Sequence, residues 1–395
     1  MADSNKVVVA VGEESTWGSV ASSMTQLPIV SGSMTESPST VRSQQLRTDA
    51  QFAGTKRTGI EATAQFEVEL QGDNLDTLLR AALRNGSSND WSNVDIDTTC
   101  SGTEGWDTGN TAELTLSGVT GLVAGQWIYV SGTAFGSAGS VGWFQIASIA
   151  GNTVTVTSAT QPTVGELPSS GTFNVKGDKV RNGADLTSFT LQAQYSDLTN
   201  EYRRMTGARI TSLGVSATAQ SIMTGSVGFG GKRVTRESST AASVTAATEN
   251  EVMSEVDSFD GFWIDGAEEA NYSLTSVNLN IAASGRPLRG LGALENKAMQ
   301  LGPLEVTGSI EMYLDATTYQ TWLPKLSGFT SFSLGFAVND GLGHRYFFFL
   351  PKCKLTSEAG NIPGIDQDVM LTMDFSAEPD TIGSETKTIE IVRAV

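Results

Sequence analysis

Two segments far apart in the chain alternate between apolar and polar residues with a period of two. Residues Ile60–Leu70 read IEATAQFEVEL, and residues Leu304–Leu314 read LEVTGSIEMYL. Alternation of this length predicts a β-strand with one buried face and one wet face. Set in register, the two segments place glutamates at matched positions, Glu61 with Glu305 and Glu67 with Glu311.

The resemblance between the two segments continues downstream of each strand. Residues 73–83 and 317–326 both carry apolar side chains at helical spacing, and Asp73 or Asn74 is expected to cap the first helix. Three further pairs of segments then match in the same order: 187–191 with 330–334, 208–213 with 353–357, and 223–229 with 369–375. Collinear matches of this extent indicate an internal duplication.

The sequence therefore predicts a mainly β protein built from two tandem antiparallel β-sandwich or barrel folds, each with one short helix. We assign residues 27–86 and 183–237 to the first fold and residues 271–395 to the second. Residues 87–182 have no counterpart in the second fold. Short alternating runs separated by glycine-rich turns, at 112–116, 126–130, 143–146 and 153–156, predict a small inserted β domain there.

Two segments fall outside the matched folds. Residues 1–26 are expected to be an N-terminal arm that orders on assembly. Residues 238–270 begin with Ser, Thr and Ala and continue with eight carboxylates and no basic residue, so we interpret them as an exposed acidic linker. No stretch approaches the roughly 18 apolar residues of a membrane helix, and no secretory signal is recognised, so no membrane association is expected.

The charge of the chain restricts its function. Its 395 residues carry a net charge of −18, whereas proteins that hold nucleic acid by its phosphates need clustered Lys and Arg. An acidic surface is compatible with one past which DNA moves without adhering, because like charges repel.

Catalytic motifs are scarce. The single histidine, His344, lies in the turn-like Asp340–Arg345 segment, where a structural role is favoured. Cys100 and Cys353 do not form a CxxC-type metal or redox motif, and the acidic linker lacks EF-hand spacing. Gly225–Lys232 fails the GxxxxGK[ST] pattern of a phosphate loop. We therefore expect no enzyme activity, no catalytic residue, no metal and no cofactor.

Short motifs spread over nearly the whole chain resemble those of siphophage major tail tube proteins. They are the segments Glu14–Gly18, Leu27–Ser33, Arg42 with Leu46–Asp49, Gly125–Ile128, Arg181–Gly183, Phe347–Pro351 and Phe375–Glu378. The resemblance implies a sandwich-like fold of which six copies close a ring, with the inner sheets joined into one barrel of roughly 24 strands that is wide enough to leave a channel. Rings of this kind stack into the hollow tail tube through which DNA is ejected.

Because the chain is expected to hold two such folds, three chains would suffice for a pseudo-sixfold ring, and we favour this trimer over a hexamer. The other partners that the resemblance implies are the tape measure, the tail terminator and the distal tail or hub proteins, with double-stranded DNA passing through the lumen without specific binding. The protein is expected in the virion tail, after synthesis in the host cytoplasm.

Two groups of residues are candidates for function. The wet face of the paired strands is expected to line the lumen, with Glu61, Glu67, Glu69, Glu305 and Glu311 repelling phosphate. The long loops at about 37–59 and 284–303 are expected to contact neighbouring subunits and rings, through Arg42, Arg47, Asp49, Lys56, Arg57, Arg286, Arg289 and Lys297. The alternative for the first group is a face that points to solvent or to the next subunit, and the alternative for the second is a solvated basic loop.

Two other functions stay open. One is a hub or distal ring protein with the same fold, which would make a single ring and stop. The other is a phage-associated carbohydrate-binding protein, in which Trp106, Trp127 and Trp143 of the insert would stack on sugars.

Overall fold

The computed structural model describes residues 3–86, 91, 95–99, 104–135, 138–162, 170–269, 273–360, 364–365 and 367–395. The protein is mainly β, as the sequence predicts, with two helices of the matched folds standing beside long strands. Cys100 lies outside the described residues.

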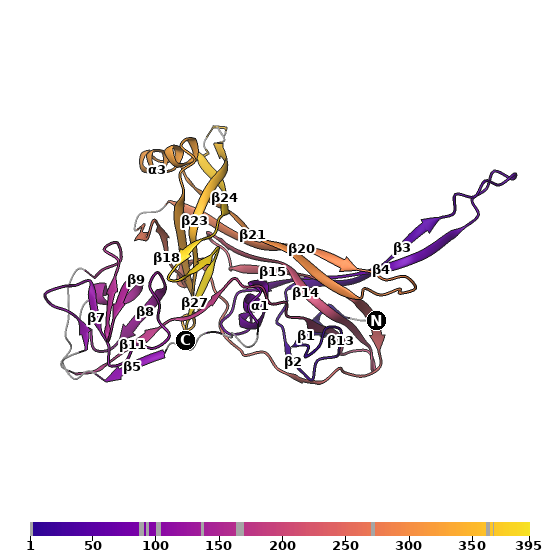
Figure 1. The fold of residues 1–395 in the computed structure, drawn as a ribbon, viewed down its shortest axis with the longest axis horizontal. Coiled ribbons are helices and arrows are strands. Elements are labelled where there is room, and N and C mark those ends of the chain that lie inside the picture. The colour runs from indigo at the N-terminus through magenta and orange to yellow at the C-terminus, as the bar shows by residue number, and fades with distance from the viewer. Residues whose placement is uncertain are drawn as a thin grey trace.

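One long antiparallel sheet runs through both halves of the chain (Figure 1). Its strands, in spatial order, are β3 (Ser31–Arg42), β4 (Thr55–Glu69), β15 (Thr224–Gly231), β14 (Tyr202–Thr218), β20 (Leu274–Leu288), β21 (Ala298–Tyr313), β24 (Met370–Ala377) and β23 (Arg345–Gly360). We call these eight strands the long sheet. The first four belong to the first fold and the last four to the second, in the same order of hairpins.

The two folds share a local irregularity as well as an order. A β-bulge falls between Ile210 and Ser212 where β14 pairs with β15, and another falls between Leu355 and Ser357 where β23 pairs with β24. A bulge sits at one definite place in a strand, so its recurrence at matched positions aligns the two folds residue by residue. This alignment makes Glu67 equivalent to Glu311, because Glu67 pairs with Ser226 as Glu311 pairs with Thr372. The two folds therefore repeat one arrangement of strands, in the order in which the sequence segments match.

Each fold is completed by a second group of strands that covers one face of the long sheet. In the first fold these are β2 (Ser23–Gln26), β1 (Val7–Glu13), β13 (Phe189–Tyr195) and β16 (Arg233–Glu237). In the second they are β19 (Ala267–Glu268), β18 (Phe259–Ile264), β22 (Phe332–Asn339), β27 (Glu390–Ala394) and β12 (Asp178–Arg181). β14 and β23 belong to both layers, since their first halves pair with the covering strands and their second halves with the long sheet.

The core lies between these layers. Phe229 of the long sheet stands edge-on to Phe189 of the covering strands, with ring centroids 6.3 Å apart. In the second fold Phe336 stacks on Phe348, its partner in the covering layer, at 4.8 Å, and both rings are buried in the same core. Every second residue of β4 from Ile60 to Val68 is buried in this core. The alternation read from the sequence is thus the division of the long sheet into a packed face and a polar face.

The helices α1 (Asp76–Ala82) and α3 (Ala316–Ser327) follow β4 and β21 as predicted. Asp315 caps α3 through a hydrogen bond that the Thr318 N–H donates over 2.6 Å. The predicted cap of α1 is wrong, because Leu75 takes the N-cap position without a side-chain bond. Asp73 has a positive φ of 60° and turns its carboxylate to His344 instead, with 3.1 Å between Oδ2 and Nε2.

The segments expected to be an arm and a linker are in fact equivalent first strands of the two folds. Within residues 1–26, β1 pairs with β13, and within residues 238–270, β18 pairs with β22, each followed by a short partner strand. Segment 238–270 also holds β17 (Ser243–Thr245) and α2 (Glu255–Ser258). Phe262 and Ile264 of β18 are buried in the main core, so the segment is not simply an exposed linker.

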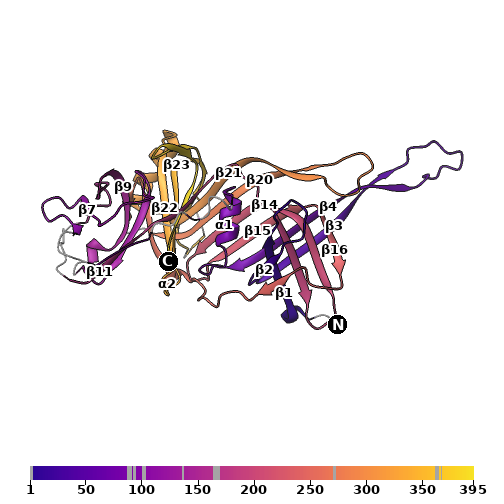
Figure 2. The ribbon, with the colours of Figure 1, turned by 60° about the horizontal axis from the view of Figure 1, so that its bottom comes forward.

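The inserted segment forms a separate seven-stranded sheet with its own core (Figure 2), except that β12, which lies within the predicted bounds 87–182, pairs with β27 of the second fold. Its strands in spatial order are β5 (Asp95–Thr99), β11 (Thr172–Lys176), β8 (Trp127–Gly132), β9 (Gly142–Ala150), β10 (Thr153–Val156), β7 (Glu113–Thr115) and β6 (Gly105–Trp106). The four predicted strands are present, and β5, β6 and β11 were missed. Two short strands near the C-terminus, β25 (Asp380–Ile382) and β26 (Glu385–Lys387), form a hairpin.

Candidate functional site

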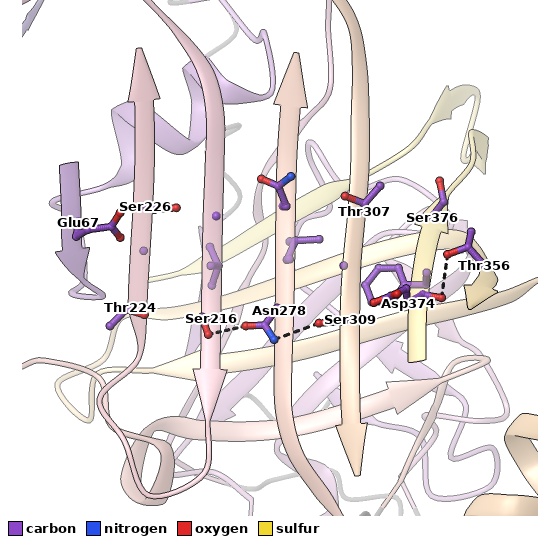
Figure 3. Close-up of a pocket in the computed structure, with 17 residues that line it drawn as sticks. Glu67, Ser216, Thr224, Ser226, Asn278, Thr307, Ser309, Thr356, Asp374 and Ser376 are labelled. Carbon is purple, nitrogen blue, oxygen red and sulfur yellow. Dashed lines mark hydrogen bonds between the residues drawn. The ribbon is translucent and has the colours of Figure 1, made fainter. Parts of the chain in front are cut away.

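The polar face of the long sheet carries an open hollow of about 660 Å³ (Figure 3). Residues from seven strands line it, and apart from backbone and apolar edges they are mostly short hydroxyl and amide side chains. The charged residues that line the hollow are Glu67 and Asp374, both acids. The hollow spans both folds, because β4, β14 and β15 contribute from the first and β20, β21, β23 and β24 from the second.

Hydrogen bonds tie the polar face together across the boundary between the folds. Ser216 of the first fold donates to Asn278 Oδ1 of the second over 2.6 Å, and Asn278 Nδ2 donates to Ser309 Oγ over 3.2 Å (Figure 3). A neutral amide held by two hydroxyls presents polarity to the hollow without positive charge. This surface stays hydrated next to a polyanion. The described residues that line the hollow include no Arg or Lys whose N–H groups could bind a phosphate.

The structure places the five candidate glutamates on this polar face, in different surroundings. Glu67 lines the hollow, and Glu311 accepts a hydrogen bond from Thr372 over 3.4 Å. Glu69 is half-buried and Glu305 exposed. Glu61 forms an ion pair with Arg289, 3.0 Å from Nη2 to Oε1, so a residue expected to face the lumen touches one expected in a contact loop.

The long loops expected at 37–59 and 284–303 are mostly strand. β3 and β4 continue as a hairpin whose connection is only residues 43–54, and β20 and β21 are joined by residues 289–297. The β3–β4 hairpin projects alone from the molecule in Figure 1. It carries Arg42, Arg47, Asp49, Lys56 and Arg57, all exposed, with Arg47 paired to Asp49 at 2.6 Å. Leu46 and Phe52 on its tip are 101% and 76% exposed.

The second hairpin is docked on the first fold. Besides the Arg289–Glu61 pair, Glu295 of the connecting loop accepts a hydrogen bond from Arg233 Nη1 over 2.8 Å. Asn296 donates to the Gly231 carbonyl over 2.9 Å. Arg286 and Lys297 are exposed. Sequence reasoning treated the two loops alike, whereas the structure separates a docked hairpin from a free one.

The strands β14 and β20 join the two folds into one sheet. They pair from Ser212 with Ala282 to Thr218 with Ser276. Sequence reasoning missed this joint, since nothing in either strand alone specifies its neighbour.

A family model described as phage tail tube protein matches residues 4–377. The chain belongs to the phage tail tube protein family. No curated protein matches it in a sequence comparison. Family membership makes it a structural protein of the virion tail.

The candidate sugar-stacking tryptophans of this tail tube protein are packed inside. Trp106 and Trp127 are fully buried and Trp143 is 7% exposed. Trp127 stacks on Phe347 of the second fold at 4.3 Å between ring centroids, and Trp263 of β18 meets both rings. Trp127 and Trp143 attach the insert to the tube fold, whereas Trp106 lies in the insert's own core. None of the three offers a ring face to a glycan.

The remaining candidates of the tail tube protein are also structural. His344 lies between Asp340 and Asp73 and links the β22–β23 turn to the segment before α1. Burial raises the pKa of the Cys353 thiol. Within the described residues, no cluster of three or more His, Cys, Asp or Glu side chains is placed to hold a metal ion. No helix in that part of the chain is long and apolar enough to cross a membrane.

Proposed function

We propose that three copies of this tail tube protein close a ring, and that stacked rings form the conduit through which DNA leaves the capsid. The observation that carries this proposal is the long sheet, in which two folds already stand side by side with the same strand order and one continuous polar face. Each chain then supplies eight strands, and three chains supply about 24, well above the 16 to 18 that already leave an aqueous channel in porins.

The stagger of the long sheet supports closure at this size. A row of directly paired residues leads from Glu67 across β15, β14 and β20 to Thr307 of β21. Glu311, the equivalent of Glu67, lies four residues beyond Thr307 on β21, which is four strands away from β4. A shift of one residue per strand corresponds to a tilt of about 35°, within the usual range for barrels. About 24 strands at that tilt give a backbone diameter of about 45 Å.

The polar face of the long sheet would then line the lumen, because the opposite face is covered by the second layer of each fold. Threefold repetition sets three copies of each acid around the bore, with Glu67 and Glu311 at equivalent places in alternate folds. Carboxylates repel the DNA backbone, and neutral hydroxyls and amides between them stay hydrated, so the duplex slides without adhering.

Charge reversal on the bore tests the lumen assignment. In phage carrying E67K/E311K, tubes of normal length are expected, because both side chains are on the polar face and not in the core. DNA release triggered in vitro, followed by a dye that reports free DNA, is expected to slow, and the slowing is expected to lessen as salt rises. E249K/E251K, in the segment between β17 and α2, supplies the same charge change away from the sheet. Equal release rates in the two variants would contradict the assignment.

Electron microscopy of the purified protein separates the tube from a hub or distal ring. Stacked hollow tubes of variable length are expected, because every ring would present the same two faces. Single rings that never stack would favour the hub. Contacts with the tape measure, terminator and distal tail proteins belong to the same proposal and would occur at the two ends of the tube.

A further inference from the structure

The pairing of β14 with β20 inside the chain has an equivalent position at which the described strand edges are left unpaired. The second half of β14 is paired on both edges, with β15 on one side and β20 on the other. Its equivalent, the second half of β23, is paired with β24 on one side, and the pairing with β22 on the other side ends at Cys353. Among the described residues, the edge of β23 from Thr356 to Gly360 therefore has no strand beside it.

The opposite edge of the long sheet is open in the matching way. β3 is equivalent to β20, because Ser31 pairs with Glu67 as Ser276 pairs with Glu311. β20 has a strand on each edge, whereas the strand that the structure pairs with β3 in the described part of the chain is β4. In Figure 1 the β3–β4 hairpin projects from one end of the molecule, whereas β23 and β24 stand upright well away from it, left of the centre, so one chain does not bring these two edges together.

We infer that β23 of one chain pairs antiparallel with β3 of a second copy, in the register of the internal β14–β20 joint. This inference rests on the ring proposed above and names the strands and residues that close it. In the alignment of the two folds, residues of β14 have equivalents in β23, and residues of β20 have equivalents in β3. Replacing the β14–β20 pairs by these equivalents gives four intermolecular pairs within the described residues: Ser357 with Ser37, Glu358 with Glu36, Ala359 with Thr35, and Gly360 with Met34.

A proline marks the end of this ladder. Pro38 in β3 has no N–H to donate, so a pairing strand has to stop beside it. Its equivalent in the second fold is Ala283, the first residue of β20 beyond the internal ladder, which ends at Ala282. The joint between chains is therefore predicted to end at Ser37, at the same position as the joint within the chain.

The equivalence of the two folds also explains why the β3–β4 hairpin projects alone. Within one chain, the β20–β21 hairpin crosses the joint and docks on the first fold through Arg289 and Glu61. Across the intermolecular joint, the β3–β4 hairpin reaches the second fold of the neighbour, where Glu305 is the exposed equivalent of Glu61. Arg42 of the incoming hairpin supplies the complementary charge.

Disulfide trapping tests the register directly. Directly opposed residues of an antiparallel pair have Cα atoms about 4.5–5.5 Å apart, within the range of a disulfide. T35C/A359C is expected to give a covalent trimer on a non-reducing gel after mild oxidation of assembled protein. T35C/S357C, whose second cysteine also points to the polar face but two residues away, is expected to cross-link at least about fivefold less. Each single-cysteine variant controls for the native thiols.

The outcomes separate the joint from the tube. Preferential trapping by T35C/A359C supports the joint even if the rings do not stack. Tubes or rings seen by electron microscopy without this trapping, or with equal trapping by T35C/S357C, overturn the β23–β3 register and leave the tube in place. Protein that neither assembles nor cross-links at any concentration overturns both.

Discussion

At the scale of single residues, a buried ion pair fastens the insert exit to the second fold. Glu390 of β27 is fully buried and accepts a hydrogen bond from Arg181 Nε of β12 over 2.6 Å. Burial raises the pKa of the Glu390 carboxyl, and the charge and hydrogen bond of Arg181 oppose that rise. A pair of this kind contributes little over an apolar replacement, but it is costly to break because one charge then stays buried alone.

Removal of one partner is therefore expected to cost more than removal of both. R181M is predicted to lower the free energy of unfolding by about 3–5 kcal/mol, and R181M/E390L to recover most of the loss. Urea denaturation measures both. R236M, which removes a surface pair with Glu201, is the matched control and is expected to cost about 1 kcal/mol or less. A double variant less stable than R181M would contradict this account.

Lys179, two residues before Arg181, is expected to make the free energy of unfolding change with pH in the alkaline range. Burial lowers the pKa of its amine to about 8 from an ordinary 10.5. Between these values the unfolded chain binds more protons than the folded chain, so the Lys179 contribution to stability rises with pH. It is fully present above pH 10.5 and lost as pH falls through 8.

The difference in unfolding free energy between wild type and K179Q is therefore expected to grow in favour of the wild type from about pH 8 to pH 10. Urea titrations at several pH values, each done on both proteins, measure it. The comparison cancels the titration of other lysines and tyrosines. A difference that stays flat over this range would show that the amine is solvated in the folded protein.

At the scale of elements, the two joints of the long sheet differ in their packed face. Inside the chain, Leu213 lies opposite Ile281, and both are buried. In the proposed joint between chains, the equivalent residues are Glu358 and Glu36. Like charges placed directly opposite destabilise a strand pair, and charged side chains on an edge strand are a common protection against premature pairing.

Neutralising this pair is expected to ease assembly. E358Q keeps the shape of an exposed side chain and removes one of the two charges, so the protein concentration at which light scattering first reports assembly should fall severalfold. E249Q makes the same change on an exposed residue away from both edges. If the two variants assembled at the same concentration, Glu358 would not face another carboxylate in the ring.

The tip of the β3–β4 hairpin is expected to govern stacking more than ring closure. Leu46 and Phe52 expose large apolar surfaces there, and such surfaces on a projecting element are usually covered by a partner. L46S/F52S should give rings that do not lengthen into tubes, as seen by electron microscopy and sedimentation. V256S, on exposed α2, is the control. Tubes of normal length in L46S/F52S would assign the tip to another role.

Two long strands with one wet face were predicted clearly from sequence, whereas the buried strand β18 was not. β4 and β21 alternate cleanly because solvent lies on one side of them. β18 shows no alternation, since Phe262 and Ile264 enter the main core while Trp263 packs against the insert. Its acidic neighbours then suggested a linker. β1 was assigned to an arm because its equivalence to β18 could be recognised only from strand pairing.

At the scale of the whole molecule, duplication could be read from the sequence, but the order of strands could not. Matched segments identify two folds, yet the order of their strands depends on contacts between residues more than 60 positions apart, such as Ser212 with Ala282. The period of two in each strand was enough to place the candidate glutamates together on the polar face of the long sheet. That Glu67 lines the hollow while Glu61 contacts Arg289 could be seen only in the three-dimensional structure.

The number of chains in one ring is the most direct test of the central claim. Cryo-electron microscopy of assembled tubes, refined without imposed symmetry, is expected to show three chains per ring, with a continuous inner barrel and mass three times the 41.6 kDa of the chain. Each chain should contribute both folds to the wall. A ring of six chains, with the second fold of each lying outside the barrel, would contradict the account.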